Sequence, residues 1–212
     1  MKTENHITTL FLDIGGVLLS DGWDRNSRKA GAETFHLDHH DMEERHHLNF
    51  ETYELGKMSL DEYLDSVVFY KKRDFNRDEF KTFMYEQSRP QPEMITLIIN
   101  LKKEYNLKIA VISNEGRELN EYRIKKFKLN TLIDFFISSS FVNLRKPDAS
   151  IFRLALDIAQ VDPGESLYID NQPLFVEIAE RFGIKGIWHT DIASTEDQLY
   201  AYGLTLIPET HE

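Results

Sequence analysis

The sequence contains no cysteine, so the chain can form no disulfide and can use no thiol chemistry. This composition is typical of a reducing compartment, and we expect a cytoplasmic protein. The N-terminal residues 1–6 lead into an apolar stretch that is too short for a signal peptide or a membrane span. No other apolar run approaches membrane length. The sequence therefore predicts neither a disulfide-stapled secreted domain nor a membrane partner.

Positive charge is scarce relative to negative charge. The chain has 25 lysines and arginines against 36 aspartates and glutamates, which gives a formal net charge of -11. We therefore expect no nucleic acid partner, although a local pocket can still hold a small anion. With 212 residues, of which 41% are hydrophobic, the chain can bury a core. We expect a folded monomer or homodimer whose partner is a small molecule.

Short apolar runs bounded by turn residues predict buried β-strands. These runs are residues 10–13, 108–114, 135–138, 166–170 and 186–189. Patterns of helical period lie between the last four runs, so strand and helix alternate from about residue 92 onward. This alternation predicts a doubly wound, Rossmann-like α/β fold, in which helices cover a parallel sheet.

Residues 20–88 interrupt this alternation, and their pattern indicates helix throughout. Two capping boxes, one beginning at Ser59 and the other at Asn76, predict helix starts. A proline-rich turn after the segment marks the return to the alternating pattern. We therefore predict an α/β core made of residues 1–19 and 89–212, with an inserted helical cap made of residues 20–88.

Polar side chains stand where the predicted strands end. Asp13, Ser113 with Asn114, and Asp170 close three strands, and Lys146 begins a helix after a fourth. In an open parallel sheet, ligands bind in the crevice at the carboxyl ends of the strands. Each residue alone is compatible with ordinary turn chemistry. Together they predict one polar rim, where the lysine at a helix start favours a nearby anion.

Four motifs in this order resemble those of the haloacid dehalogenase superfamily, whose members are mostly phosphatases that use an aspartate nucleophile. The motifs are Phe11-Leu12-Asp13-Ile14-Gly15-Gly16-Val17, Val111-Ile112-Ser113-Asn114, Arg145-Lys146-Pro147-Asp148 and Tyr168-Ile169-Asp170-Asn171. Within the superfamily, the chain resembles the alpha-D-glucose-1-phosphate phosphatase branch, whose first motif is similar and also has a glycine two residues after the nucleophile.

The resemblance implies a Mg²⁺-dependent phosphatase that hydrolyses small phosphorylated metabolites, with sugar phosphates favoured, through an aspartyl-phosphate. Asp13 would attack phosphorus, because a clamped phosphoryl group is electrophilic enough for a carboxylate. The metal would be held by Asp13, Asp170 and the carbonyl of Gly15. Lys146 would neutralise the phosphate and steady Asp13. The phosphate-binding residues would be Ser113, Asn114 and Lys146.

Gly15 departs from most phosphatases of the superfamily, which carry a second aspartate there as the acid–base residue. The absence of an acid–base residue slows a reaction, typically by about 10²–10⁴-fold, without forbidding it. Three interpretations stay open. A leaving group of low pKa needs little protonation, or Asp21 or Asp24 carries the proton instead. Alternatively, the protein is a non-catalytic phosphate-binding or regulatory module.

A 2-haloacid dehalogenase is the alternative enzyme class. It also lacks the second aspartate, but it displaces a halide from carbon without a metal and would not require an acid like Asp170. Asn171 stands where many relatives have a second acid, and it either binds metal through water or closes a turn.

Two groups of residues in the predicted cap are given a structural interpretation. The histidines, His36, His39, His40, His46 and His47, are expected on exposed helix faces rather than at a metal. The aromatic residues Trp23, Phe50 and Tyr53 are expected in the core rather than in contact with substrate.

Overall fold

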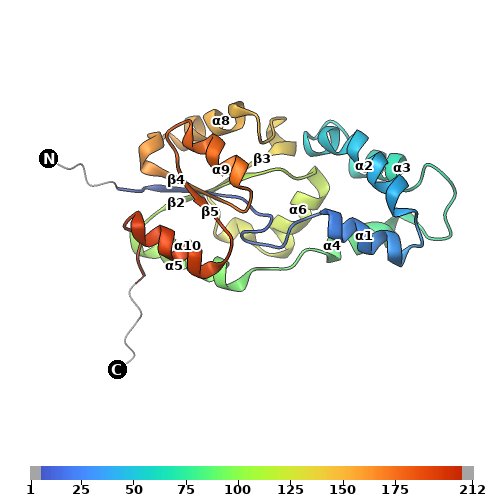
Figure 1. The fold of residues 1–212 in the computed structure, drawn as a ribbon, viewed down its shortest axis with the longest axis horizontal. Coiled ribbons are helices and arrows are strands. Elements are labelled where there is room, and N and C mark those ends of the chain that lie inside the picture. Colours follow the sequence, from blue (N-terminus) through green and yellow to red (C-terminus); the bar gives the residue numbers. More distant parts are fainter. Residues whose placement is uncertain (1–5, 207–212) are drawn as a thin grey trace, which may run out of the picture.

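The computed structural model describes residues 6–206, whose centre is a five-stranded parallel sheet (Figure 1). The strand order is β3-β2-β1-β4-β5. The strands are β1 (Thr9–Leu12), β2 (Lys108–Ser113), β3 (Phe135–Ser138), β4 (Ser166–Asp170) and β5 (Lys185–Trp188). All four pairings are parallel, which confirms the doubly wound α/β fold. The order reverses direction at β1, the position where such sheets bind ligands.

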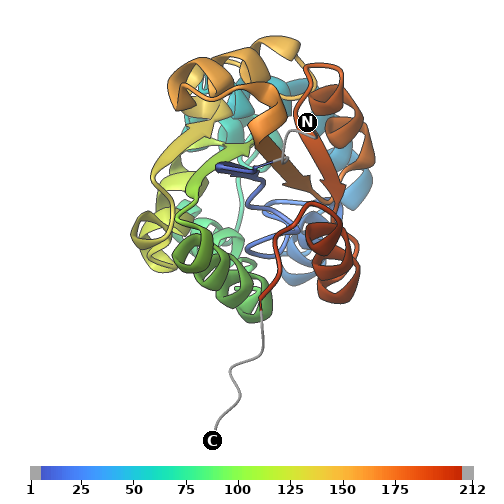
Figure 2. The same cartoon turned by 90° about the vertical axis from the view of Figure 1, so that its left-hand side faces the viewer.

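Helices cover both faces of the sheet (Figures 1 and 2). One face carries α5 (Pro92–Tyr105) and α10 (Ile192–Ala201), and the other carries α8 (Ala149–Ala159) and α9 (Pro173–Glu180). The remaining helices of this part of the chain are α6 (Arg117–Lys126) and the short α7 (Ser139–Val142), with 3-10 turns at Leu129–Thr131 and Pro163–Glu165. No helix within residues 6–206 combines the length and the apolar character needed to cross a membrane.

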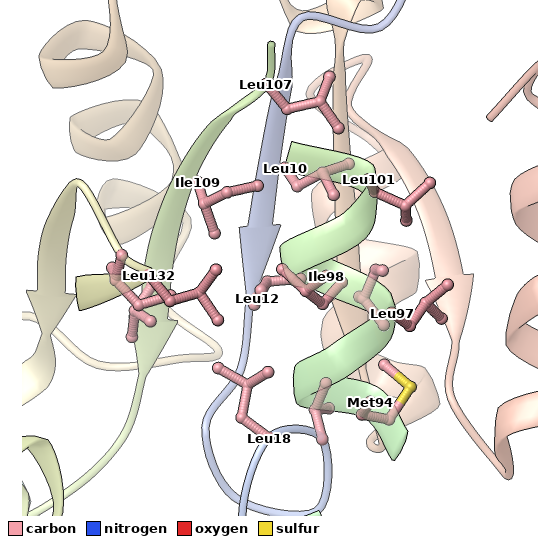
Figure 3. Packing of buried hydrophobic residues seen from close by; sticks show 14 of the residues in the cluster. Leu10, Leu12, Leu18, Met94, Leu97, Ile98, Leu101, Leu107, Ile109 and Leu132 are labelled. Carbon is pink, nitrogen blue, oxygen red and sulfur yellow. The ribbon is translucent and has the colours of Figure 1, made fainter. Parts of the chain in front are cut away.

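The alternation of side chains along β1 explains why both faces need helices. Leu10 and Leu12 pack with residues of α5, including Ile98 (Figure 3), whereas Phe11 packs with Phe152 of α8. All three β1 side chains are fully buried. A strand that is apolar on both faces is stable only between two covering layers.

The segment 20–88 is helical, as the sequence predicts, and lies at one end of the molecule (Figure 1). Its helices are α1 (Arg25–Thr34), α2 (His39–Glu54), α3 (Leu60–Val67) and α4 (Arg77–Glu86). Both predicted capping boxes form, at Ser59 and at Asn76. The four helices share a hydrophobic cluster centred on Tyr63 and Phe80, which are fully buried.

The chain enters and leaves this helical segment at one place. The backbone N–H of Ser20 donates to the carbonyl of Arg89 at 2.8 Å, and that of Gln91 donates to Leu18 at 2.9 Å. The Arg123 side chain of α6 also donates to the Ser20 carbonyl. The two connecting strands of chain therefore run side by side, as expected for an inserted segment. The division into core and cap stays a prediction.

Candidate active site

The edge formed by the carboxyl ends of the strands brings three predicted residues together. Asp13 directly follows β1, Ser113 closes β2 and Asp170 closes β4. The register pairs Leu12 with both Val111 and Ile169, so the three strands end at the same level. The lysine comes from the loop before α8, and its Nζ lies 3.3 Å from Asp13 Oδ1 and 2.7 Å from Asp170 Oδ2. One ammonium group therefore joins the two carboxylates.

Lys146 is held firmly in this position. Its side chain is 1% exposed, and its Nζ donates to the hydroxyl of Tyr168 at 3.0 Å. Burial lowers the pKa of Lys146, but Asp13 and Asp170 outweigh that effect and raise the pKa above its ordinary value, so the group is charged. Its backbone is fixed by Asn114, which donates to the Lys146 carbonyl and accepts from its N–H, both at 2.8 Å. The side chain of Asn114 therefore positions the lysine.

Asp13 is a buried carboxylate with little direct stabilisation. Burial raises its pKa to about 6, with a further contribution from Asp170, whereas Lys146, the Ser113 hydroxyl and the Ile14 amide act in the opposite direction. Its Oδ1 lies 3.3 Å from the Lys146 ammonium but accepts no hydrogen bond within residues 6–206. A carboxylate oxygen left in this state is available to form a bond with a substrate or an ion.

The oxygen atoms at this edge fit a magnesium ion. Among residues 6–206, no three histidine, cysteine, aspartate or glutamate side chains gather as a metal site. Mg²⁺ needs fewer, since it commonly takes one or two carboxylates and keeps several waters. Asp13 offers Oδ1, which has an ion-pair contact with Lys146 but no hydrogen bond, and Asp170 offers Oδ1, which within residues 6–206 accepts only the N–H of Gln172 at 2.7 Å. The Gly15 carbonyl, predicted as the third protein ligand, belongs to the loop that follows Asp13.

A cavity of about 420 Å³ opens beside Asp13, between the carboxyl ends of the strands and the helical segment. Its lining on the sheet side includes Asp13, Gly15, Ser113, Lys146 and Asn171, and on the helical side Trp23, His46, Phe50, Tyr53 and Tyr63. The sequence-based interpretation of Trp23, Phe50 and Tyr53 as core residues is therefore incomplete, because each of them also lines the cavity.

Arginines around the cavity are mostly neutralised by acids. Three of the four are paired: Arg28 with Glu43, Arg123 with Glu115, and Arg145 with Glu51 and Glu54. The fourth, Arg25, is exposed. The Arg145 pairs at 3.1 and 2.8 Å also tie α2 to the loop that carries Lys146.

The two acids left open as proton carriers differ in their surroundings. Asp24 caps α1, since its Oδ1 accepts the N–H of Ser27 at 2.7 Å. Both acids line the cavity, but Asp21 lies next to Gly15, where an added Cβ atom would be 3.6 Å from its Oδ1. Asn171 donates to that same oxygen at 3.2 Å. Asp21 therefore occupies the space next to the missing second acid, and Asn171 holds it there.

Among the cavity and site residues that the sequence did not indicate are His46, Tyr63 and Tyr168. Tyr168 could have been found, because a residue two positions before Asp170 on a strand points to the same side of the sheet. Its hydroxyl also donates to Asp170 Oδ2. His46 and Tyr63 carry no such signal, since their meeting depends on how α2 packs against α3.

Residues 27–189 match the family described as haloacid dehalogenase-like hydrolase. The chain belongs to this family. The matched stretch begins after Asp13, so the placement of the candidate nucleophile rests on the geometry above. The (S)-2-haloacid dehalogenase 4A of Burkholderia cepacia is 24% identical over 103 residues, which cover 49% of this chain and 44% of that enzyme. The match thus spans less than half of the relative's length.

Solved structures of haloacid dehalogenase (HAD) family proteins share the fold of this chain. HAD family enzyme bt-2542 of Bacteroides thetaiotaomicron, in complex with magnesium and inorganic phosphate, has a TM-score of 0.71 at 21% identity, covering 85% of this chain and 93% of that one. A predicted HAD-like hydrolase of Porphyromonas gingivalis has a TM-score of 0.72 at 20% identity, covering 91% and 98%. The L-2-haloacid dehalogenase RSc1362 has a TM-score of 0.64 at 19% identity, covering 87% of each chain. The family match over residues 27–189 establishes the superfamily, while the alpha-D-glucose-1-phosphate phosphatase branch stays a prediction.

Proposed function

We propose that this hydrolase is a Mg²⁺-dependent phosphatase of small phosphorylated metabolites, with sugar phosphates favoured, and that residues 20–88 act as its cap. The observation that supports this most directly is the Lys146 ammonium shared by Asp13 and Asp170. Phosphoryl transfer uses a nucleophile, a cation and an acid that can hold metal. Displacement of a halide from carbon needs no metal, so Asp170 would then serve only to hold Lys146.

In the proposed reaction, Asp13 attacks phosphorus and the bond from phosphorus to the leaving oxygen breaks, which gives an aspartyl-phosphate. Lys146 neutralises charge on the phosphoryl oxygens, and the Ser113 hydroxyl donates to one of them. Asp13, Asp170 and the Gly15 carbonyl would hold Mg²⁺, whose charge stabilises the transferred group when bound. Water then attacks phosphorus and releases Asp13.

We assign the proton transfers to Asp21 in place of the acid missing at Gly15. Protonated Asp21 gives its proton to the leaving oxygen, and the resulting carboxylate takes a proton from the attacking water. Its place beside Gly15 supports this role, and the hydrogen bond from Asn171 orients the carboxylate.

A magnesium-dependent assay on p-nitrophenyl phosphate tests the proposed function. We expect release of p-nitrophenol with Mg²⁺ and its loss in excess EDTA, because the activated leaving group scarcely needs an acid. Binding of inorganic phosphate without any turnover would favour the non-catalytic module instead.

Replacing Asp21 by asparagine tests the proton transfer. We expect kcat on an alkyl phosphate to fall by about 10²–10⁴-fold, with a smaller loss on p-nitrophenyl phosphate. Asp24→Asn is the matched control, because asparagine caps helices as well as aspartate does and should leave stability and activity unchanged. Equal losses on both substrates would contradict the role of Asp21.

The second candidate is a 2-haloacid dehalogenase. Gly15 and the 24% identical relative favour it. Halide release from an (S)-2-haloacid in the presence of EDTA, without hydrolysis of the aryl phosphate, would establish this function over the phosphatase.

A further inference from the structure

The helical wall of the cavity carries a chain of hydrogen bonds that the proposed chemistry does not use. It links Trp23, Tyr63 on α3 and His46 on α2, and all three line the cavity. Trp23 Nε1 donates to the Tyr63 hydroxyl at 3.2 Å, and that hydroxyl lies 2.8 Å from His46 Nδ1. Tyr63 is fully buried and Trp23 is nearly so. The two hydrogen bonds share the Tyr63 hydroxyl, so the donor and acceptor roles in one bond restrict those in the other.

The direction of the two hydrogen bonds follows from the chemistry of the three groups. An indole N–H only donates, so the Tyr63 oxygen accepts from Trp23. Within residues 6–206 the Tyr63 hydroxyl has no possible acceptor other than His46 Nδ1, so its single proton is assigned to that bond. In a neutral imidazole one nitrogen accepts and the other carries the hydrogen. With the hydroxyl proton assigned in this way, His46 carries its own hydrogen on Nε2.

His46 is kept neutral and its ring is fixed. Burial lowers the pKa of His46 to about 3, with help from Arg28 and against the effect of Glu43. The ring stacks on Phe50 with centroids 5.2 Å apart and planes inclined by 29°. Its Nε2 has no hydrogen-bond partner within the part of the chain that the structure describes. The Nε2–H group is therefore an oriented, uncharged donor available to a ligand.

The surroundings of this donor indicate which ligand it suits. Three of the four cavity arginines already have carboxylate partners, and the fourth, Arg25, is exposed to solvent, so the wall offers little buried charge for a second anion. Phe50, Trp23 and Tyr53 present aromatic surface that can pack against C–H groups. An uncharged donor among aromatic rings matches a hydroxyl or ether oxygen on an otherwise neutral group.

We propose that His46 Nε2–H binds a hydroxyl or ring oxygen of the leaving group, and that the substrate is a phosphate monoester of a neutral hydroxylated compound with no second anionic group. This inference rests on the proposed phosphatase function. It makes His46 a specificity residue, with Tyr63 and Trp23 as positioning residues that set its tautomer.

The test compares His46→Phe with wild type on two kinds of substrate. One is p-nitrophenyl phosphate, which has no hydroxyl, and the other is the best substrate among glucose 1-phosphate, glucose 6-phosphate and glycerol 1-phosphate. We expect kcat/KM on the hydroxylated substrate to fall about 10-fold, the scale of one hydrogen bond, while the aryl phosphate stays within about twofold. His47→Phe is the matched control, because His47 neighbours His46 on α2 but does not line the cavity, and it should change neither value.

Further variants and substrates separate the outcomes. His46→Gln keeps an N–H donor and should retain most of the preference, which also covers the case in which the phenylalanine variant fails to fold. Equal losses on both substrates, or an unchanged preference in His46→Phe, would overturn the inference. A wild type that hydrolyses the aryl phosphate but acts best on fructose 1,6-bisphosphate or a phosphorylated carboxylic acid would also overturn it, leaving the phosphatase intact. Absence of Mg²⁺-dependent aryl phosphate turnover would instead overturn the proposed function.

Discussion

Asp13→Asn is expected to abolish Mg²⁺-dependent hydrolysis of p-nitrophenyl phosphate, with a loss of about 10⁴-fold or more in kcat. The amide cannot form the bond to phosphorus, and replacement of a covalent nucleophile usually costs at least this much. A steady-state assay over a range of enzyme concentrations measures the residual rate. Activity within tenfold of wild type would show that Asp13 is not the nucleophile.

Thermal unfolding provides the control for this variant, and the sign of the pKa shift fixes the expectation. The folded-state pKa of Asp13, about 6, lies above the ordinary value of 3.8. The ionised carboxylate therefore lowers the free energy of unfolding increasingly as pH rises from about 3.8 to 6, and that penalty is fully present at pH 8. Asparagine carries no charge, so Asp13→Asn should be at least as stable as wild type at pH 8. Loss of activity is then not a loss of the fold.

Lys146→Met is expected to remove both activity and stability. The side chain is 1% exposed and lies within 3.3 Å of two buried carboxylates, which would lose their counter-charge. Removing one partner of a buried ion pair typically lowers the free energy of unfolding by about 3–5 kcal/mol. Urea unfolding of both proteins at pH 8 measures the difference. A change below about 1 kcal/mol would mean that the two carboxylates do not depend on this lysine.

The pH dependence of Lys146→Met distinguishes lost charge from lost packing. Without the ammonium, the folded-state pKa of Asp13 should rise further above that of the unfolded chain. The folded variant then binds more protons than the unfolded one, so its stability falls as pH rises. The deficit against wild type should therefore be smaller at pH 5 than at pH 8. In addition, Asp170→Asn combined with Lys146→Met should recover part of the stability.

The sheet and its polar rim could be predicted because their signals are local or topological. The strands Phe135–Ser138 and Ser166–Asp170 match the predicted runs, since apolar stretches bounded by turns define buried strands. The meeting of Asp13 with Asp170 follows from a rule of parallel sheets rather than from either residue. Once the sheet is parallel in this order, Asp13 and Asp170 end on the same side of it, as the sequence predicts.

The cavity wall could not be predicted, because it depends on packing between helices. The sequence left Asp21 and Asp24 as equal candidates, and they separate only when the start of α1 shows that Asp24 is its cap. His46 was interpreted as an exposed helix residue, yet it is partly buried against Tyr63 and Phe50. The side chain of Asn114 holds the Lys146 backbone, a role that the sequence did not indicate, and its contact with phosphate stays a prediction.

The nature of the adduct formed on Asp13 tests the central claim most directly. The enzyme is mixed with p-nitrophenyl phosphate and Mg²⁺, quenched in acid during turnover, digested and mapped by mass spectrometry. We predict one phosphoryl group on the peptide that contains Asp13, and no such peptide from Asp13→Asn. An unmodified Asp13 peptide during active hydrolysis, or a carboxyalkyl ester on Asp13 after treatment with an (S)-2-haloacid and EDTA, would contradict the account.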